Sequence, residues 1–116
     1  MNQLTLTTRT TASGTVVLYL AGELDFHTAP QVRGALPDLA LQPGQHLVLD
    51  LGGLTFCDSS GVSMFIGARN HAAAAGASIA LAAVPARVLR VFTVVGLDQV
   101  FTCYPSTDDA LAARPS

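Results

Sequence analysis

Apolar and polar residues alternate along the start of the chain and then gather into apolar runs. Alternation over residues 4–7 is typical of a half-buried edge strand, and the apolar run 15–20 predicts a more buried second strand. A short turn, 12–14, joins them, so we expect an antiparallel hairpin. Later apolar runs, at 46–51, 78–81 and 100–103, predict three further strands.

Helical spacing separates these later strands. The first helix is expected to begin near Thr28, and Pro37 should kink it or start a second short helix after Leu36. The other helices are expected at 59–75, 85–96 and 106–113. This order predicts an α/β fold: one domain over residues 1–116, with a mixed, mostly parallel sheet of about five strands packed with about four α-helices.

Composition narrows the class of protein. Half of the 116 residues are hydrophobic, only 12% are charged and the net charge is −2, which suits a compact domain. No basic stripe is present, so direct nucleic-acid binding is not expected. We find no signal peptide and no apolar run near the ~18 residues of a membrane span, and therefore expect a cytoplasmic protein. Cys57 and Cys103 are predicted to be reduced core residues.

The most informative stretch is the junction between the third strand and the helix after it. Gly52 and Gly53 are expected to end the strand, and Asp58 offers an oxygen that can cap the helix. Ser59 and Ser60 then lie in the first helical turn, at the carboxyl end of a strand. In parallel α/β sheets, ligands and chemistry gather at this end.

Helical geometry distinguishes the two serines. At about 100° per residue, with Val62 taken as the centre of the apolar arc, Ser60 lies on the opposite, polar side. Ser59 lies beside Ile66. We therefore expect Ser60 to face solvent and Ser59 to sit at the buried edge.

Catalytic and cofactor motifs are missing from the sequence. The residues around Ser60 do not form Gly-x-Ser-x-Gly, and His71 lies about three helical turns away, too far to take a proton. The usual nucleotide-binding loops and zinc spacings are also absent. We expect no enzyme activity, no cofactor and no metal. The two serines could equally be ordinary helix-start residues.

A resemblance to a known family supports a functional interpretation. The motif 58–62, Asp-Ser-Ser-Gly-Val, at a strand-to-helix junction resembles the signature of the STAS domain, found in anti-sigma factor antagonists and attached to sulfate transporters. Residues 22–25 and 96–98 resemble weaker motifs of the same family. The resemblance spans essentially the whole chain, in the same order of elements.

The resemblance implies a phosphorylation switch. In the family, the second serine of the motif, here Ser60, is phosphorylated by a serine protein kinase that is also the anti-sigma factor. The unphosphorylated form binds this partner and frees the sigma factor for transcription, and a phosphatase reverses the modification. The oligomeric state stays open between a monomer and a weak dimer.

The expected partner surface surrounds Ser60 at the carboxyl end of the sheet. Its residues are Asp25, Asp58, Ser59, Ser60, Gly61, Ser63, Met64 and Gly67. One alternative is a STAS accessory or scaffold subunit of a stress-signalling or membrane lipid-transport assembly. An enzyme is a third and weaker alternative.

Overall fold

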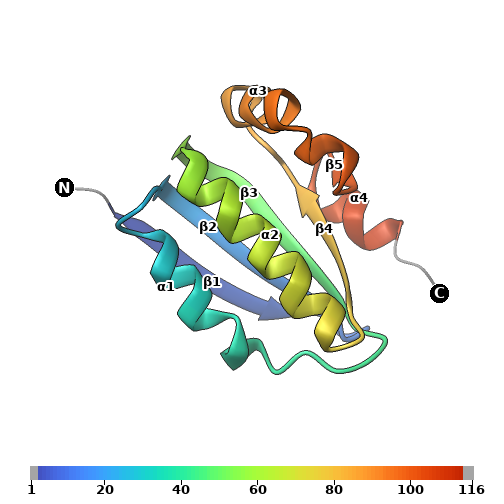
Figure 1. Cartoon of the computed structure of the whole chain (residues 1–116). Coiled ribbons are helices and arrows are strands. Elements are labelled where there is room, and N and C mark those ends of the chain that lie inside the picture. The colour runs from blue at the N-terminus through green and yellow to red at the C-terminus, as the bar shows by residue number, and fades with distance from the viewer. Residues whose placement is uncertain (1–2, 114–116) are drawn as a thin grey trace.

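The computed structural model describes residues 3–113, which form one five-stranded sheet (Figure 1). The spatial order of the strands follows the chain. Only β1 and β2 are antiparallel, and every later pair is parallel. The predicted hairpin, edge strand and mixed sheet are thus confirmed. The strands are β1 (Leu4–Thr10), β2 (Val16–Leu24), β3 (His46–Cys57), β4 (Ser78–Ala82) and β5 (Cys103–Tyr104).

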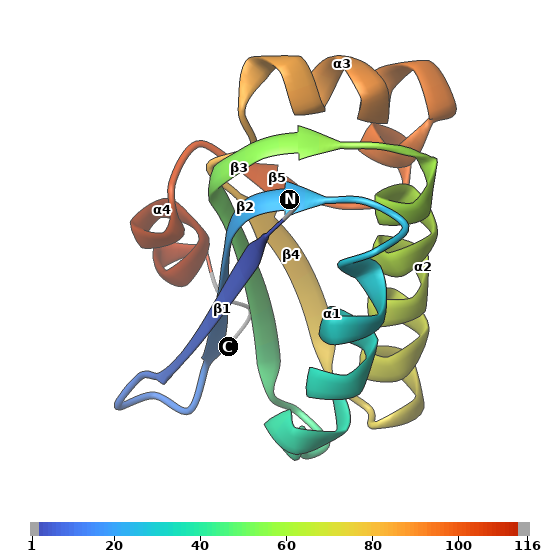
Figure 2. The same cartoon turned by 90° about the vertical axis from the view of Figure 1, so that its left-hand side faces the viewer.

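Helices cover both faces of the sheet and one of its ends. In Figure 2, α1 and α2 lie side by side on one face, α4 lies on the other, and α3 crosses near the carboxyl end of β3. Short 3-10 turns follow α1 and α3, and the first begins at Pro37 as predicted. The helices are α1 (Ala29–Ala35), α2 (Ser59–Ala74), α3 (Ala86–Val95) and α4 (Thr107–Ala112), with the turns η1 (Pro37–Leu39) and η2 (Leu97–Gln99).

The main core lies between the sheet and the α1–α2 layer. Leu18, Leu49 and Phe65 are fully buried there, and each such side chain contributes about 1.5–3 kcal/mol when it leaves water. Phe92 of α3 meets Phe65 edge to face, with ring centroids 5.2 Å apart, so α3 is joined to the same core.

A smaller core lies under α4, on the other face of the sheet. Val17, Val48, Ala82 and Ala110 pack together there. The Thr107 hydroxyl donates to the Asp50 carboxylate at 2.7 Å, which ties the start of α4 to β3.

The third strand is longer than the sequence predicted. Gly52 and Gly53 were expected to end it, but β3 continues through them to Cys57. A Cβ on Gly53 would lie 2.8 Å from the Ala21 Cβ on β2, where the pairing register shifts. The glycine therefore permits close strand approach at a bulge and does not end the strand.

The carboxyl-terminal part of the chain also differs from the expectation. A strand was predicted at 100–103, but the last strand is the two-residue β5 at Cys103–Tyr104. The 3-10 turn η2 precedes it. Cys103 is exposed and is not a core residue, whereas Cys57 is buried as expected; both are free thiols.

Two glycines of α2 differ sharply in their surroundings. A Cβ on Gly61 would lie 2.6 Å from the Cys57 sulfur and 3.0 Å from Leu24 Cγ, whereas a Cβ on Gly67 would meet nothing within 4 Å. We predict that Gly61→Ala lowers the free energy of unfolding by about 1–3 kcal/mol through overpacking. Gly67→Ala should raise it by about 0.5–1 kcal/mol through helix propensity.

Urea unfolding of both variants checks this prediction. The two substitutions are chemically identical and lie in one helix. The difference between their free energies of unfolding therefore reports on the contact between α2 and the ends of β2 and β3. Equal stability of the two variants would contradict the tight approach at Gly61.

Candidate functional site

The Asp58 carboxylate organises the start of α2. Its Oδ1 accepts hydrogen bonds from the backbone N–H of Ser60 at 2.8 Å and of Gly61 at 3.3 Å, which confirms the predicted N-cap. The Asp58 N–H donates to the Leu24 carbonyl at 3.2 Å. The end of β2 and the start of α2 are therefore held directly together, at the same end of the sheet, as the sequence predicted.

The two serines are oriented differently from the prediction. Ser59 is exposed and Ser60 is half-buried, so the expected assignment of buried edge and solvent side is reversed. The buried stripe of α2 is centred near Gly61, not Val62, and consists of Gly61, Met64, Phe65, Ala68 and Ala72. At about 100° per residue, Ser60 flanks this stripe and Ser59 lies nearly opposite to it.

Two residues expected on the partner surface are buried in the core. The Met64 side chain is fully buried, and Gly61 packs against Leu24 and Cys57. Both were placed on the surface because the apolar arc was centred on the wrong residue. Ser63 is exposed and Gly67 is half-buried, so both keep access to solvent on α2. Arg69, further along the same helix, is exposed.

Asp25 is buried and holds the loop between β2 and α1 through hydrogen bonds to its backbone. It is only 5% exposed, and its Oδ1 accepts from the backbone N–H of His27 at 2.9 Å and of Thr28 at 3.0 Å. The Thr28 hydroxyl accepts from the Asp25 N–H and donates to the Glu23 carbonyl, so it holds this loop and does not cap α1. Asp25 is therefore buried beneath the surface on which the sequence analysis expected it.

The same loop presents Phe26 to solvent. Its side chain is 74% exposed, and its ring meets His27 edge to face at 5.9 Å. The sequence analysis missed this residue. A usable signal was present, because an Asp side chain that bonds the backbone two residues on predicts a turn, and turn residues lie at the surface.

A hollow of about 380 Å³ lies between α1 and α2, beside the exposed phenylalanine. It brings a hydroxyl, an aromatic ring and a guanidinium together at one end of the sheet. Its lining residues are Phe26, Ala29, Pro30, Arg33, Ser60 and Ser63. Of the two motif serines, Ser60 lines this hollow and the exposed Ser59 does not.

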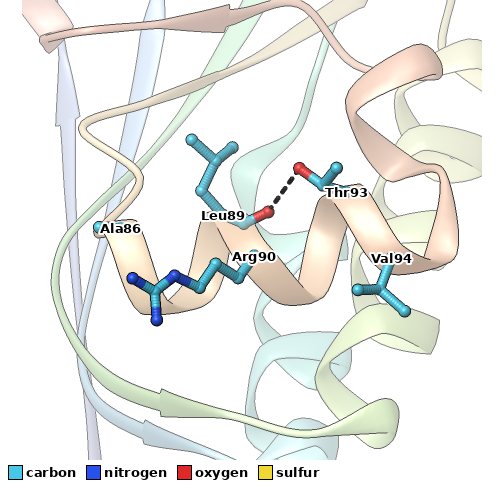
Figure 3. A pocket seen from close by; sticks show the side chains of 5 residues that line it. All are labelled: Ala86, Leu89, Arg90, Thr93 and Val94. Atoms are coloured by element: carbon cyan, nitrogen blue, oxygen red, sulfur yellow. Dashed lines mark hydrogen bonds between the residues drawn. The ribbon is translucent and has the colours of Figure 1, made fainter.

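A second hollow, of about 560 Å³, lies along the outer side of α3 (Figure 3). Its wall is one helix, with Leu89, Arg90 and Val94 among the lining side chains. The Thr93 hydroxyl donates to the Leu89 carbonyl of its own helix at 2.9 Å. No residue of the β3–α2 junction lines it.

Nucleophilic and metal chemistry find little support in the site. Burial, and secondarily the neighbouring Asp58 carboxylate, raises the pKa of the Cys57 thiol to about 11, so the sulfur stays protonated at neutral pH. Within residues 3–113, no group of three or more His, Cys, Asp and Glu side chains could hold a metal ion. Over the same residues, every helix is too short or too polar to cross a bilayer.

Comparisons with known proteins show which family the chain resembles. The family model of the STAS domain matches residues 7–110. The chain is 35% identical over 100 residues to an anti-sigma F factor antagonist of Paenibacillus polymyxa, covering 84% of this chain and 85% of that protein. It is 31% identical to an anti-sigma-B factor antagonist of Listeria monocytogenes, over 72% of this chain and 73% of the relative.

A solved structure shares both the fold and part of the sequence. The crystal structure of an anti-sigma factor antagonist from Mycobacterium paratuberculosis superposes with a TM-score of 0.85 at 27% identity, covering 97% of this chain and 94% of that one. The resemblance that the Asp-Ser-Ser-Gly motif indicated is thus confirmed over nearly the whole chain, and the protein belongs to the STAS-domain family.

Proposed function

We propose that this protein is an anti-sigma factor antagonist whose binding is switched by phosphorylation of Ser60. The observation that carries the proposal is the position of Ser60, at the edge of a hollow beside an exposed phenylalanine. The relatives are anti-sigma factor antagonists, and this supplies the class of partner. That partner is an anti-sigma factor that also acts as a serine protein kinase, and a phosphatase restores the unmodified form.

The docking surface that we propose surrounds the hollow. It comprises the accessible residues of the two neighbouring elements: Phe26, Asp58, Ser59, Ser60, Ser63 and Gly67. Phe26 is the natural anchor, because large aromatic side chains dominate the binding energy of many interfaces. Asp25, Gly61 and Met64 support this surface from within.

Charge accounts for release of the partner. The kinase transfers the γ-phosphoryl group of a nucleoside triphosphate to the Ser60 oxygen; the serine proton passes to a base, and the nucleoside diphosphate leaves. The product carries about −1.5 to −2 additional charge at neutral pH. In a docked interface beside Asp58, this group faces desolvation and like-charge repulsion of several kcal/mol. At about 1.4 kcal/mol per tenfold change in affinity, that is enough to dissociate a tight complex.

Two substitutions at Ser60 separate charge from the hydroxyl. Ser60→Ala should bind the anti-sigma factor as the wild type does and resist phosphorylation, with a loss of stability below about 1 kcal/mol. Ser60→Asp should weaken binding by roughly tenfold or more, but less than phosphoserine, because it carries one charge and a shorter side chain. Calorimetric titration and thermal melts measure both effects.

Ser59→Asp is the matched control, since it adds the same charge one residue away on an exposed position. It should weaken binding less than Ser60→Asp does. Phosphopeptide mapping that placed the modification on Ser59, or equal effects of the two aspartates, would count against the assignment of the switch to Ser60.

Phe26 provides a test of the docking surface. Phe26→Ala should weaken binding of the anti-sigma factor by about 2 kcal/mol, roughly 30-fold, without changing the melting temperature, because the ring is largely outside the core. Val94→Ala removes a similarly exposed apolar side chain from α3, where the exposed fraction is 84%. It should bind like the wild type. The reverse result would move the interface to α3.

A further inference from the structure

A phosphoryl group on Ser60 would meet an unusual local environment. The start of a helix commonly stabilises an anion through free backbone amides. Here the Asp58 carboxylate already accepts from the amides of Ser60 and Gly61, and it brings a negative charge of its own. The helix start is therefore a poor source of compensation for a second anion, and a cation must come from another element.

Arg33 is the cation that the fold places at this point. It projects from α1 and lines the same hollow as Ser60 and Ser63. Among the described residues its guanidinium forms no ion pair or hydrogen bond, and the lining of the hollow includes no carboxylate. This exposed arginine therefore lies at the same hollow as Ser60 and is available to an anionic group there.

The size of the hollow suits such a group. Its volume of about 380 Å³ is roughly thirteen times the ~30 Å³ that one water molecule occupies in the liquid. A phosphoryl group and several waters therefore fit without movement of the helices. Ser63, one turn further along α2, adds an exposed hydroxyl at the same wall.

We propose that Arg33 binds the phosphoryl group of phosphorylated Ser60 inside the α1–α2 hollow. This inference rests on the proposed function, because it assigns a residue of the same site to the phosphorylated state. A guanidinium can donate two parallel N–H bonds to one phosphoryl group, which a lysine cannot reproduce. The phosphate then occupies the hollow beside Phe26 and is shielded from the phosphatase.

The test uses protein into which phosphoserine is incorporated at position 60 during synthesis, so that no kinase is needed. Phosphorus NMR measures the second pKa of the phosphate in the otherwise wild-type chain, in Arg33→Gln and in Arg33→Lys. The cation favours the dianion, so the pKa should be lowest with Arg33, intermediate with lysine and highest with glutamine. The Arg33 Nε–H resonance should also shift on phosphorylation.

Arg69→Gln is the matched control, because Arg69 is exposed on the neighbouring helix and does not line the hollow. It should leave the phosphate pKa unchanged, and hydrolysis by a phosphatase should accelerate several-fold only in Arg33→Gln. Identical pKa values in the Arg33→Gln and Arg69→Gln proteins, with no shift of the Arg33 resonance, would overturn the inference.

The two proposals fail separately. If the anti-sigma factor neither binds the unmodified protein nor phosphorylates Ser60, the proposed function is rejected whatever the NMR result. If phosphorylation of Ser60 releases the partner but the phosphate pKa does not depend on Arg33, only the present inference is rejected.

Discussion

Packing of one stripe of α2 against the sheet is the constraint on which the site depends. Gly61, Met64 and Phe65 enter the core, and this sets the rotation of the helix about its axis. Ser60 is thereby turned toward α1, and Ser59 is turned toward solvent. A helix rotated to bury Val62 would exchange these orientations, so core packing decides which serine lines the hollow, and this is the serine for which we propose the switch.

Buried polar groups hold the exposed ones in place. Asp25 accepts two backbone hydrogen bonds below the surface, and the turn that it closes holds Phe26 outward. The Asp58 carboxylate likewise fixes the start of α2, because it accepts hydrogen bonds from the backbone N–H groups of Ser60 and Gly61. Because both carboxylates accept backbone hydrogen bonds, the docking surface that we propose can present the Phe26 ring and the serine hydroxyls in fixed positions.

Electrostatics at the junction explains why modification can act locally. In the switch that we propose, an anion on Ser60 would lie beside the capping Asp58 carboxylate, and a docked partner would meet two negative groups in place of one. The domain itself does not need to refold, because the phosphate would be added at the surface. The core is held by apolar packing, such as the contact between the Phe65 and Phe92 rings.

The sequence by itself determined the α/β class, the hairpin, the Asp58 cap and the junction motif, because these depend on local periodicity and on hydrogen bonds between near neighbours. Tertiary structure decided the rest. β3 runs through Gly52 and Gly53 because Ala21 of β2 approaches there, and Met64 is buried because α2 rotates to seat Gly61 between Leu24 and Cys57. Arg33 and Ser60 line one hollow only because α1 and α2 pack side by side, an arrangement of residues distant in sequence that no local pattern encodes.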